Sequence, residues 1–250
     1  MESYLQNHPD APEYQFLLAC CRNALGSGED PLTCPPDINQ KKFIQLLRYH
    51  KLVPHLYPVV RKCSNIPDEL LNTLQDTLRQ HHFHTLRLSG ELVRISELFS
   101  RHGIPWISVK GPVLSIQLYN DITARQSNDL DILVEDAYQE AAEKVLAEAG
   151  YFRLSAPDWN KQQIKHVKTY ASDRSFMNKE KNIHLELHWK LTASNRIPPS
   201  NNDWFSSIGY VPISGQNIPT LNQEMHLLYL CIHGYHHVWF RLFWLWDIAY

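Results

Sequence analysis

Residues 104–134 read IPWISVKGPVLSIQLYNDITARQSNDLDILV, and this pattern decides the fold. It predicts, in chain order, a strand at Pro105–Val109, a Lys110-Gly111 turn, a helix at Pro112–Tyr119 and a strand at Asp129–Val134. Side chains two residues apart on a strand point to the same side, so Asp129 and Asp131 can converge on one divalent cation. Because paired aspartates also occur as solvated caps at strand starts, the neighbouring residues must support the assignment.

The Lys110-Gly111 turn stands directly before the predicted helix. Backbone N–H groups and an ammonium at a helix start can hold the oxygens of a polyphosphate. Arg125 offers a guanidinium fork for phosphate, or it pairs with Asp121 or Asp129. We therefore predict that Lys110, Gly111 and Arg125 bind nucleotide phosphates.

A third carboxylate lies on a later predicted strand. We expect two strands, at residues 165–171 and 182–189, joined by the polar turn MNKEK. In the second strand, NIHLELHW, apolar residues alternate with His184, Glu186 and His188, which share one face. A carboxylate beside the paired aspartates is costly without compensation. A metal ion shared with the aspartates, or an ion pair with a lysine of the first strand, would compensate it.

Histidines allow a second interpretation. His184 and His188 flank the third carboxylate, and His233 and His237 lie downstream with Asp247. A zinc or iron hydrolase could use such ligands, although the helical HExxH motif is absent. His233 and His237, four residues apart, share a helix face. They line a nucleotide cleft, pair with Asp247, or are core histidines.

The pattern along the chain predicts three regions. Residues 1–103 are expected to form a helical N-terminal region that ends in a long helix from Asp68 to about His102. Residues 104–192 form an α/β core. Residues 193–250 form a connector and a helical C-terminal region, whose aromatic end, RLFWLWDIAY, predicts further covering helices that this sequence does not include.

Composition excludes several classes of protein. The 250 residues are 44% hydrophobic, which suffices for a core. A formal net charge of −2 predicts no extended nucleic acid and no membrane as partner. No apolar run could span a bilayer, and the N-terminus lacks a secretory pattern. The five cysteines lack CxxC spacing, so we expect reduced thiols in a cytoplasmic protein.

Several segments together resemble the uncharacterised nucleotidyltransferase family of the DNA polymerase β-like superfamily. The segments are GIPWISVKGPVLSIQLYND, ARQSNDLDILV, EAGY, LELHW and HLLYLCIHGYHHVWFRLFWLWDIA. They extend from about Leu92 to the C-terminus, and their order and spacing are more specific than any one of them. The helices before Leu92 fit the family's N-terminal region more loosely.

The resemblance implies an α+β fold, in which a small mixed β-sheet is flanked by helices. It implies that Asp129 and Asp131 ligate Mg²⁺ or Mn²⁺, and that Glu186 ligates metal or receives the proton of the attacking hydroxyl. The implied reaction transfers a nucleoside monophosphate from a nucleoside triphosphate to an acceptor hydroxyl and releases pyrophosphate.

One departure concerns the phosphate-binding turn. The wider superfamily has a Gly-Ser turn before the acidic strand, whereas this chain has Lys110-Gly111, as its own family does. The acceptor, which could be a small molecule, a protein or an RNA end, and the nucleotide base are left open. The alternatives are a histidine/carboxylate metal-dependent hydrolase and an inactive nucleotide-binding module.

Overall fold

The computed structural model describes residues 10–28, 32–154, 172–191 and 201–250. The chain divides into two compact units. The first contains the described residues up to Phe83 and also Trp239–Ala249; the second contains His84–Val238 and Tyr250. Within the described residues, no helix has both the length and the apolar character needed to cross a membrane.

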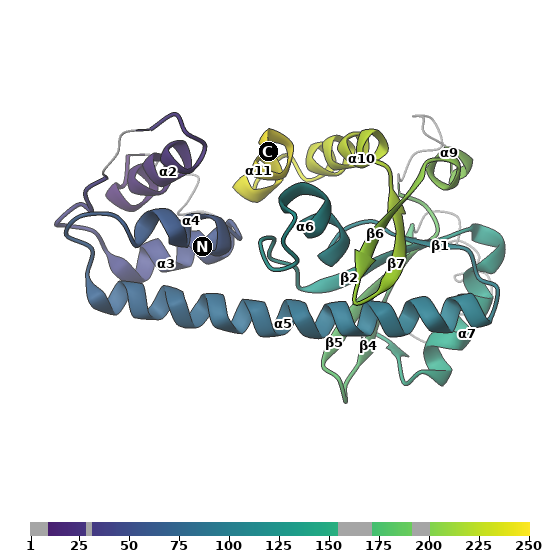
Figure 1. Cartoon of the computed structure of the whole chain (residues 1–250). Coiled ribbons are helices and arrows are strands. Elements are labelled where there is room, and N and C mark those ends of the chain that lie inside the picture. The colour runs from purple at the N-terminus through teal and green to yellow at the C-terminus, as the bar shows by residue number, and fades with distance from the viewer. Residues whose placement is uncertain (1–9, 29–31, 155–171, 192–200) are drawn as a thin grey trace. The chain divides into compact units, whose positions relative to one another are not determined.

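The first unit is helical (Figure 1). Its helices are α2 (Pro12–Ala24), α3 (Gln40–Tyr49), α4 (Val53–Val60), the first half of α5 (Asp68–Arg101) and α11 (Leu242–Ala249). Helix α4 continues through Pro58, and Leu56 and Val60 on either side of it are buried. The aromatic side chains of α11 are buried within this unit, with the Lys51 ammonium 5.2 Å from the centre of the Phe243 ring.

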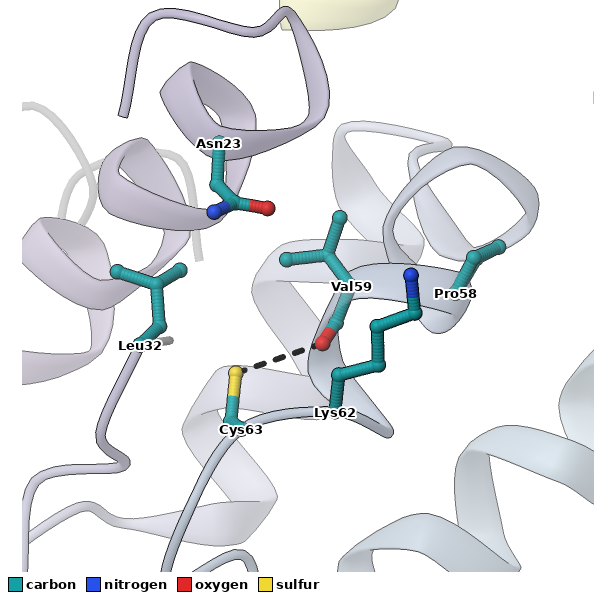
Figure 2. A pocket seen from close by; sticks show the side chains of 6 residues that line it. All are labelled: Asn23, Leu32, Pro58, Val59, Lys62 and Cys63. Atoms are coloured by element: carbon teal, nitrogen blue, oxygen red, sulfur yellow. Dashed lines mark hydrogen bonds between the residues drawn. The ribbon is translucent and has the colours of Figure 1, made fainter. Parts of the chain in front are cut away.

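A shallow pocket opens between the helices of the first unit (Figure 2). Its lining residues are Asn23, Leu32, Pro58, Val59, Lys62 and Cys63. The Cys63 thiol donates to the Val59 carbonyl at 3.5 Å, and Cys63 is itself mostly buried. The lining combines three aliphatic residues with an amide, a lysine and a thiol, and it includes none of the residues predicted for nucleotide chemistry.

Helix α5 continues through Gly90 as one long helix. Its second half belongs to the second unit, where Leu88, Leu92, Ile95 and Phe99 are fully buried. These residues recur at intervals of three and four and form the apolar stripe of an amphipathic helix. The stripe packs against one face of the sheet.

A seven-stranded mixed sheet forms the centre of the second unit (Figure 1). The strands, in spatial order, are β3 (Phe152–Arg153), β4 (Asp173–Asn178), β5 (Ile183–His188), β2 (Asp129–Val134), β1 (Trp106–Ser108), β7 (Gln216–Leu221) and β6 (Ile208–Ile213). Strands β2 and β5 are parallel neighbours, and β1 is antiparallel to β2. The predicted α+β class, a mixed sheet flanked by helices, is confirmed.

Alternate residues of β2 and β5 face opposite sides of the sheet. Leu130, Ile132 and Val134 of β2 pack with the apolar residues of β5, α5 and α7 (Gln139–Glu148) in the larger core. A second core lies near β1 and β7 and includes α9 (Asn201–Ser206) and α10 (Gln223–His236). The polar residues of β2 and β5 therefore face away from the larger core.

Within residues 193–250, expected to form a connector and a helical region, the structure also has α9 and the hairpin β6–β7, which extends the sheet on the β1 side. The strand expected at residues 165–171 lies outside the described residues. Among the described residues, the antiparallel neighbour of β5 is β4, in register from Asp173↔His188 to Asn178↔Ile183.

Candidate functional site

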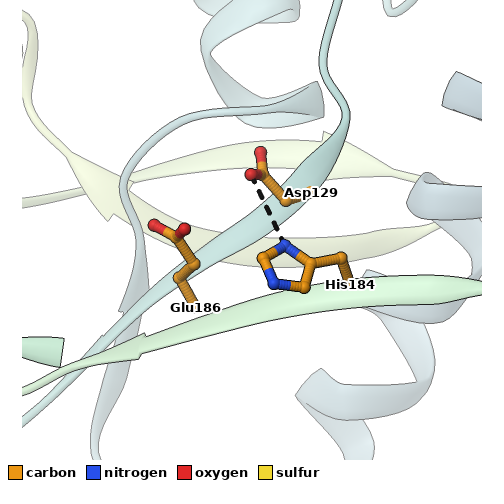
Figure 3. Close-up of side chains that lie close together, drawn as sticks. All are labelled: Asp129, His184 and Glu186. Carbon is orange, nitrogen blue, oxygen red and sulfur yellow. Dashed lines mark ion pairs between the residues drawn. The ribbon is translucent and has the colours of Figure 1, made fainter. Parts of the chain in front are cut away.

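The parallel pair β2–β5 brings the predicted acidic residues together. In its register Asp129 lies opposite His184, and Asp131 lies opposite Glu186. His188 lies opposite Leu133, two residues beyond Glu186 along β5. Neighbouring strands are about 4.8 Å apart, so side chains on the same face of such a pair come within reach of one ion. Figure 3 shows the side chains of Asp129 and Glu186 extending from adjacent strands toward the same region.

Asp129, His184 and Glu186 form the more exposed of two donor groups (Figure 3). One ligand atom from each lies within 4.8 Å of the others, and the Asp129 side chain is 32% exposed. The His184 Nδ1 atom is 3.7 Å from Asp129 Oδ2. Interaction with Asp129 raises the pKa of His184 against the opposing effect of partial burial. This group is open to an incoming ligand.

Asp131, Glu186 and His188 form a second, more buried donor group. The Asp131 side chain is only 5% exposed, and its Oδ1 is 2.9 Å from Lys110 Nζ and 3.3 Å from His188 Nε2. The His188 Nε2 atom is also 3.6 Å from Glu186 Oε2. The structure thus brings Lys110 to a carboxylate, where the sequence alone predicted only a phosphate ligand.

Attraction between the Asp131 carboxylate and its cationic neighbours determines which side chains of this group are ionised. Burial opposes ionisation of Asp131, but the Lys110 ammonium and the bond to His188 outweigh it and lower the pKa of Asp131. Burial also lowers the pKa of Lys110, but the charge of Asp131 outweighs this and raises it. In His188, hydrogen bonding to Asp131 and Glu186 overcomes burial and raises the pKa to about 9. Two cations therefore neutralise the buried carboxylate near neutral pH.

The turn that carries Lys110 requires a glycine. Gly111 has φ 70° and ψ −138°, a region that only glycine adopts without strain. A Cβ atom at this position would lie 3.6 Å from the Asp129 carbonyl oxygen. The Val109 amide donates to the Asp131 carbonyl at 3.1 Å. The turn is thereby fastened beside the start of β2.

Arg125 is buried in the loop that leads to β2. Its backbone amide donates to Ser115 Oγ at 3.0 Å, and its guanidinium donates to Ser127 Oγ at 3.4 Å. Asp121, one of the alternative partners considered for it, accepts from the amide and hydroxyl of Thr123, both at 2.8 Å. A phosphate-binding role for Arg125 stays a prediction.

His233 lies on α10 and His237 is the C-cap of that helix; their ring centres are 4.5 Å apart. Burial, followed by the nearby charge of Lys110, lowers the pKa of His233 to about 2. His233 is therefore neutral at pH 7. Asp247, considered as a partner from the sequence, lies on α11 in the first unit and is buried there. The cleft assignment of the two histidines stays a prediction.

Two further residues of α10 approach the Lys110 turn, and sequence reasoning missed both. The Lys110 ammonium lies 5.8 Å from the centre of the Tyr229 ring. His226 is 2% exposed and lies against the Val109 carbonyl. The signal in the sequence is the helical spacing of 226, 229 and 233, which is equally typical of core residues.

Protonation of His226 should make the free energy of unfolding depend on pH. Burial lowers its pKa to about 4; the Val109 carbonyl opposes this, and the charges of Arg125 and Lys110 add to it. The pKa of histidine in the unfolded chain is about 6.5. The contribution of neutral His226 to the free energy of unfolding is therefore fully present above pH 6.5, and it is lost, by up to about 3 kcal/mol, as the pH falls toward 4. We expect urea unfolding to show a shallower decline over this range in His226→Gln; an identical slope in both proteins would contradict the assignment.

Comparison with known proteins identifies the family. The sequence profile of a family described as uncharacterised nucleotidyltransferase matches residues 36–250. The chain belongs to this family. Family membership makes the protein a nucleotidyltransferase with a nucleotide substrate, which confirms the resemblance inferred from its sequence.

Two solved structures are similar to this nucleotidyltransferase. A lincomycin-bound lincosamide antibiotic adenylyltransferase, LnuA, is 18% identical with a TM-score of 0.39, covering 56% of this chain and 83% of that one. The antibiotic-resistance factor ANT(2'')-Ia is 13% identical with a TM-score of 0.40, covering 58% and 71%. Likeness of this degree carries no inference about this chain. A search of curated proteins found no match.

Proposed function

We propose that this nucleotidyltransferase transfers a nucleoside monophosphate from a metal-bound nucleoside triphosphate to the hydroxyl of an acceptor, with release of pyrophosphate. The observation that carries the proposal is the convergence of Asp129, Asp131 and Glu186 across one parallel strand pair, beside the Lys110-Gly111 turn. Family membership supports nucleotidyl transfer in general. The identity of the ion, the role of each residue and the use of a hydroxyl as acceptor are proposed here.

The donor atoms fit a divalent cation. Asp129 and Glu186 are partly exposed and supply carboxylate oxygens, the ligands that Mg²⁺ and Mn²⁺ prefer. His184 adds an imidazole nitrogen within the same 4.8 Å group. When bound, such an ion would neutralise phosphate charge and polarise the phosphorus–oxygen bond that breaks when the hydroxyl attacks phosphorus.

The chain's own residues would bind the nucleotide and orient the acceptor. Lys110, with the backbone of Gly111, would contact the phosphates and stabilise the charge that develops on the leaving pyrophosphate. Arg125 would add positive charge from the adjacent loop. Glu186 is the proposed acceptor of the hydroxyl proton when it does not ligate the ion, because it lies beside Asp131 at the exposed end of the group.

Calorimetric titration with ATP, GTP, CTP and UTP, each with Mg²⁺, tests the proposal. Metal-dependent binding of at least one triphosphate is expected. Absence of binding to all four, with zinc or iron held tightly instead, would favour the histidine/carboxylate hydrolase, since His184 and His188 lie among the carboxylates. Binding without turnover over a broad set of hydroxyl acceptors would favour an inactive nucleotide-binding module.

Replacement of Lys110 should separate polyphosphate from monophosphate binding. In Lys110→Met we expect the Kd of the preferred triphosphate to rise about 10- to 100-fold, whereas that of the monophosphate changes less than about 3-fold, because an ammonium gains most from the larger charge. The measurement is calorimetry on both ligands. Lys144→Met on α7 is the matched control, because Lys144 is an exposed lysine whose ion pair with Glu148 is long at 4.0 Å. Equal weakening of both ligands would contradict a polyphosphate role.

A further inference from the structure

His226 lies directly behind the Lys110-Gly111 turn. Its Nε2 atom is 2.5 Å from the carbonyl oxygen of Val109, the residue before Lys110. A neutral imidazole carries one N–H group, and we assign it to Nε2, because a backbone carbonyl can only accept. This hydrogen bond is buried and joins α10 to the last residue before the turn.

The other side of the imidazole contacts α6 (Pro112–Tyr119), the helix that follows the turn. The His226 Nδ1 atom is 2.5 Å from the side-chain oxygen of Gln117. Both atoms are acceptors in the assigned tautomer, so this approach is a close contact and not a hydrogen bond. The Gln117 side-chain nitrogen is 2.8 Å from the Leu221 carbonyl at the end of β7. One imidazole therefore contacts the chain before the turn and, through Gln117, the helix after it.

The turn itself has little regular structure to hold it. Gly111 is outside both helical and strand conformations, and Lys110 lies between the end of β1 and the first residue of α6. The backbone bonds of Val109 run to Asp131 on one side and to His226 on the other. Among the described contacts, loss of the His226 bond would leave the carbonyl of the Val109–Lys110 peptide without its hydrogen-bond donor, while the Val109 amide stays bound to Asp131.

We propose that His226 is a positioning residue, whose hydrogen bond to the Val109 carbonyl holds the Lys110-Gly111 turn in the geometry that binds the triphosphate. This inference rests on the proposed function of the turn. A packing role alone is the competing explanation, since the His226 ring also lies 6.5 Å from the Tyr229 ring, centre to centre, beside the second core.

Two amide variants separate the contacts of the imidazole. The side-chain nitrogen of Gln reaches the place of Nε2, whereas that of Asn reaches the place of Nδ1. His226→Gln therefore keeps the bond to Val109, and His226→Asn keeps only the contact with Gln117. We expect the Kd of the preferred Mg²⁺-bound triphosphate to rise less than about 3-fold in His226→Gln and about 10-fold in His226→Asn.

Controls distinguish positioning from packing. Monophosphate binding, and Mn²⁺ binding measured by electron paramagnetic resonance without nucleotide, should be unchanged in both variants. Thermal unfolding records any packing cost, which should be similar in the two. Gln117→Met, which keeps the Val109 bond, should bind triphosphate within about 3-fold of wild type, and it tests the inference even if His226→Asn does not fold.

The outcomes separate this inference from the proposed function. Equal loss of triphosphate affinity in His226→Gln and His226→Asn, or a 10-fold loss in Gln117→Met, would overturn the positioning role while nucleotide binding by the wild type stands. Failure of the wild type to bind any Mg²⁺-bound triphosphate would overturn the proposed function, and the inference with it.

Discussion

In the Asp129→Asn variant, we expect the Kd for the Mg²⁺-bound triphosphate to rise at least about 100-fold, or about 2.7 kcal/mol. Asp129 supplies a partly exposed carboxylate to the proposed ion, and a neutral amide is a far weaker ligand for Mg²⁺. The free energy of unfolding should change by no more than about 0.5 kcal/mol, because the ion pair that the described residues form with Asp129, to His184, is long at 3.7 Å and partly exposed.

Calorimetry and urea unfolding on the same preparations measure both quantities. Asp136→Asn is the matched control, because Asp136 is an exposed acid just beyond the opposite end of β2. The control should bind like the wild type. Wild-type affinity in Asp129→Asn would refute the assignment of Asp129 as a metal ligand.

The Asp131→Asn variant should lose stability as well as binding. Removal of this carboxylate leaves the Lys110 ammonium, 13% exposed, and the His188 imidazole without their shared charged partner. Breaking a buried ion pair from one side costs about 3–5 kcal/mol, which corresponds to a fall in Tm on the order of 10 °C for a chain of this length. Thermal unfolding followed by circular dichroism measures the effect.

A double variant tests the cause of this loss. Lys110→Met combined with Asp131→Asn removes both charges, so we expect it to recover most of the Tm lost in Asp131→Asn while triphosphate binding stays absent. If the double variant unfolds at the same temperature as Asp131→Asn, the uncompensated lysine is not the source of the instability. In that case the greater loss of stability in Asp131→Asn than in Asp129→Asn comes from packing and not from charge.

Local pattern predicted the elements that position the site. Strand β2 has the bounds expected from its sequence, and α6 begins at Pro112 as expected. The alternation in NIHLELHW placed Glu186 with its flanking histidines on one face of β5, because strand periodicity is a local property. The metal-binding roles of these residues stay predictions.

Features that depend on distant contacts were not predictable in the same way. The hairpin β6–β7 contains Pro212 and Pro219, which are typical of turns, and Pro212 is tolerated because β6 is an edge strand. The ion pair of Lys110 with Asp131 depends on the packing of the turn after β1 against β2. The contact of His226 with Val109 joins residues 117 positions apart.

The parallel register of β2 and β5 also has a consequence for misfolded forms of the chain. A slip of β5 by one residue against β2 would turn Glu186 and its flanking histidines toward the larger core and expose the leucines that alternate with them. A buried carboxylate and exposed leucines would make such a species unstable and prone to aggregate. The alternation that builds the acidic site therefore also disfavours the wrong register, and chains that adopt it should unfold or aggregate instead of persisting as folded, inactive protein.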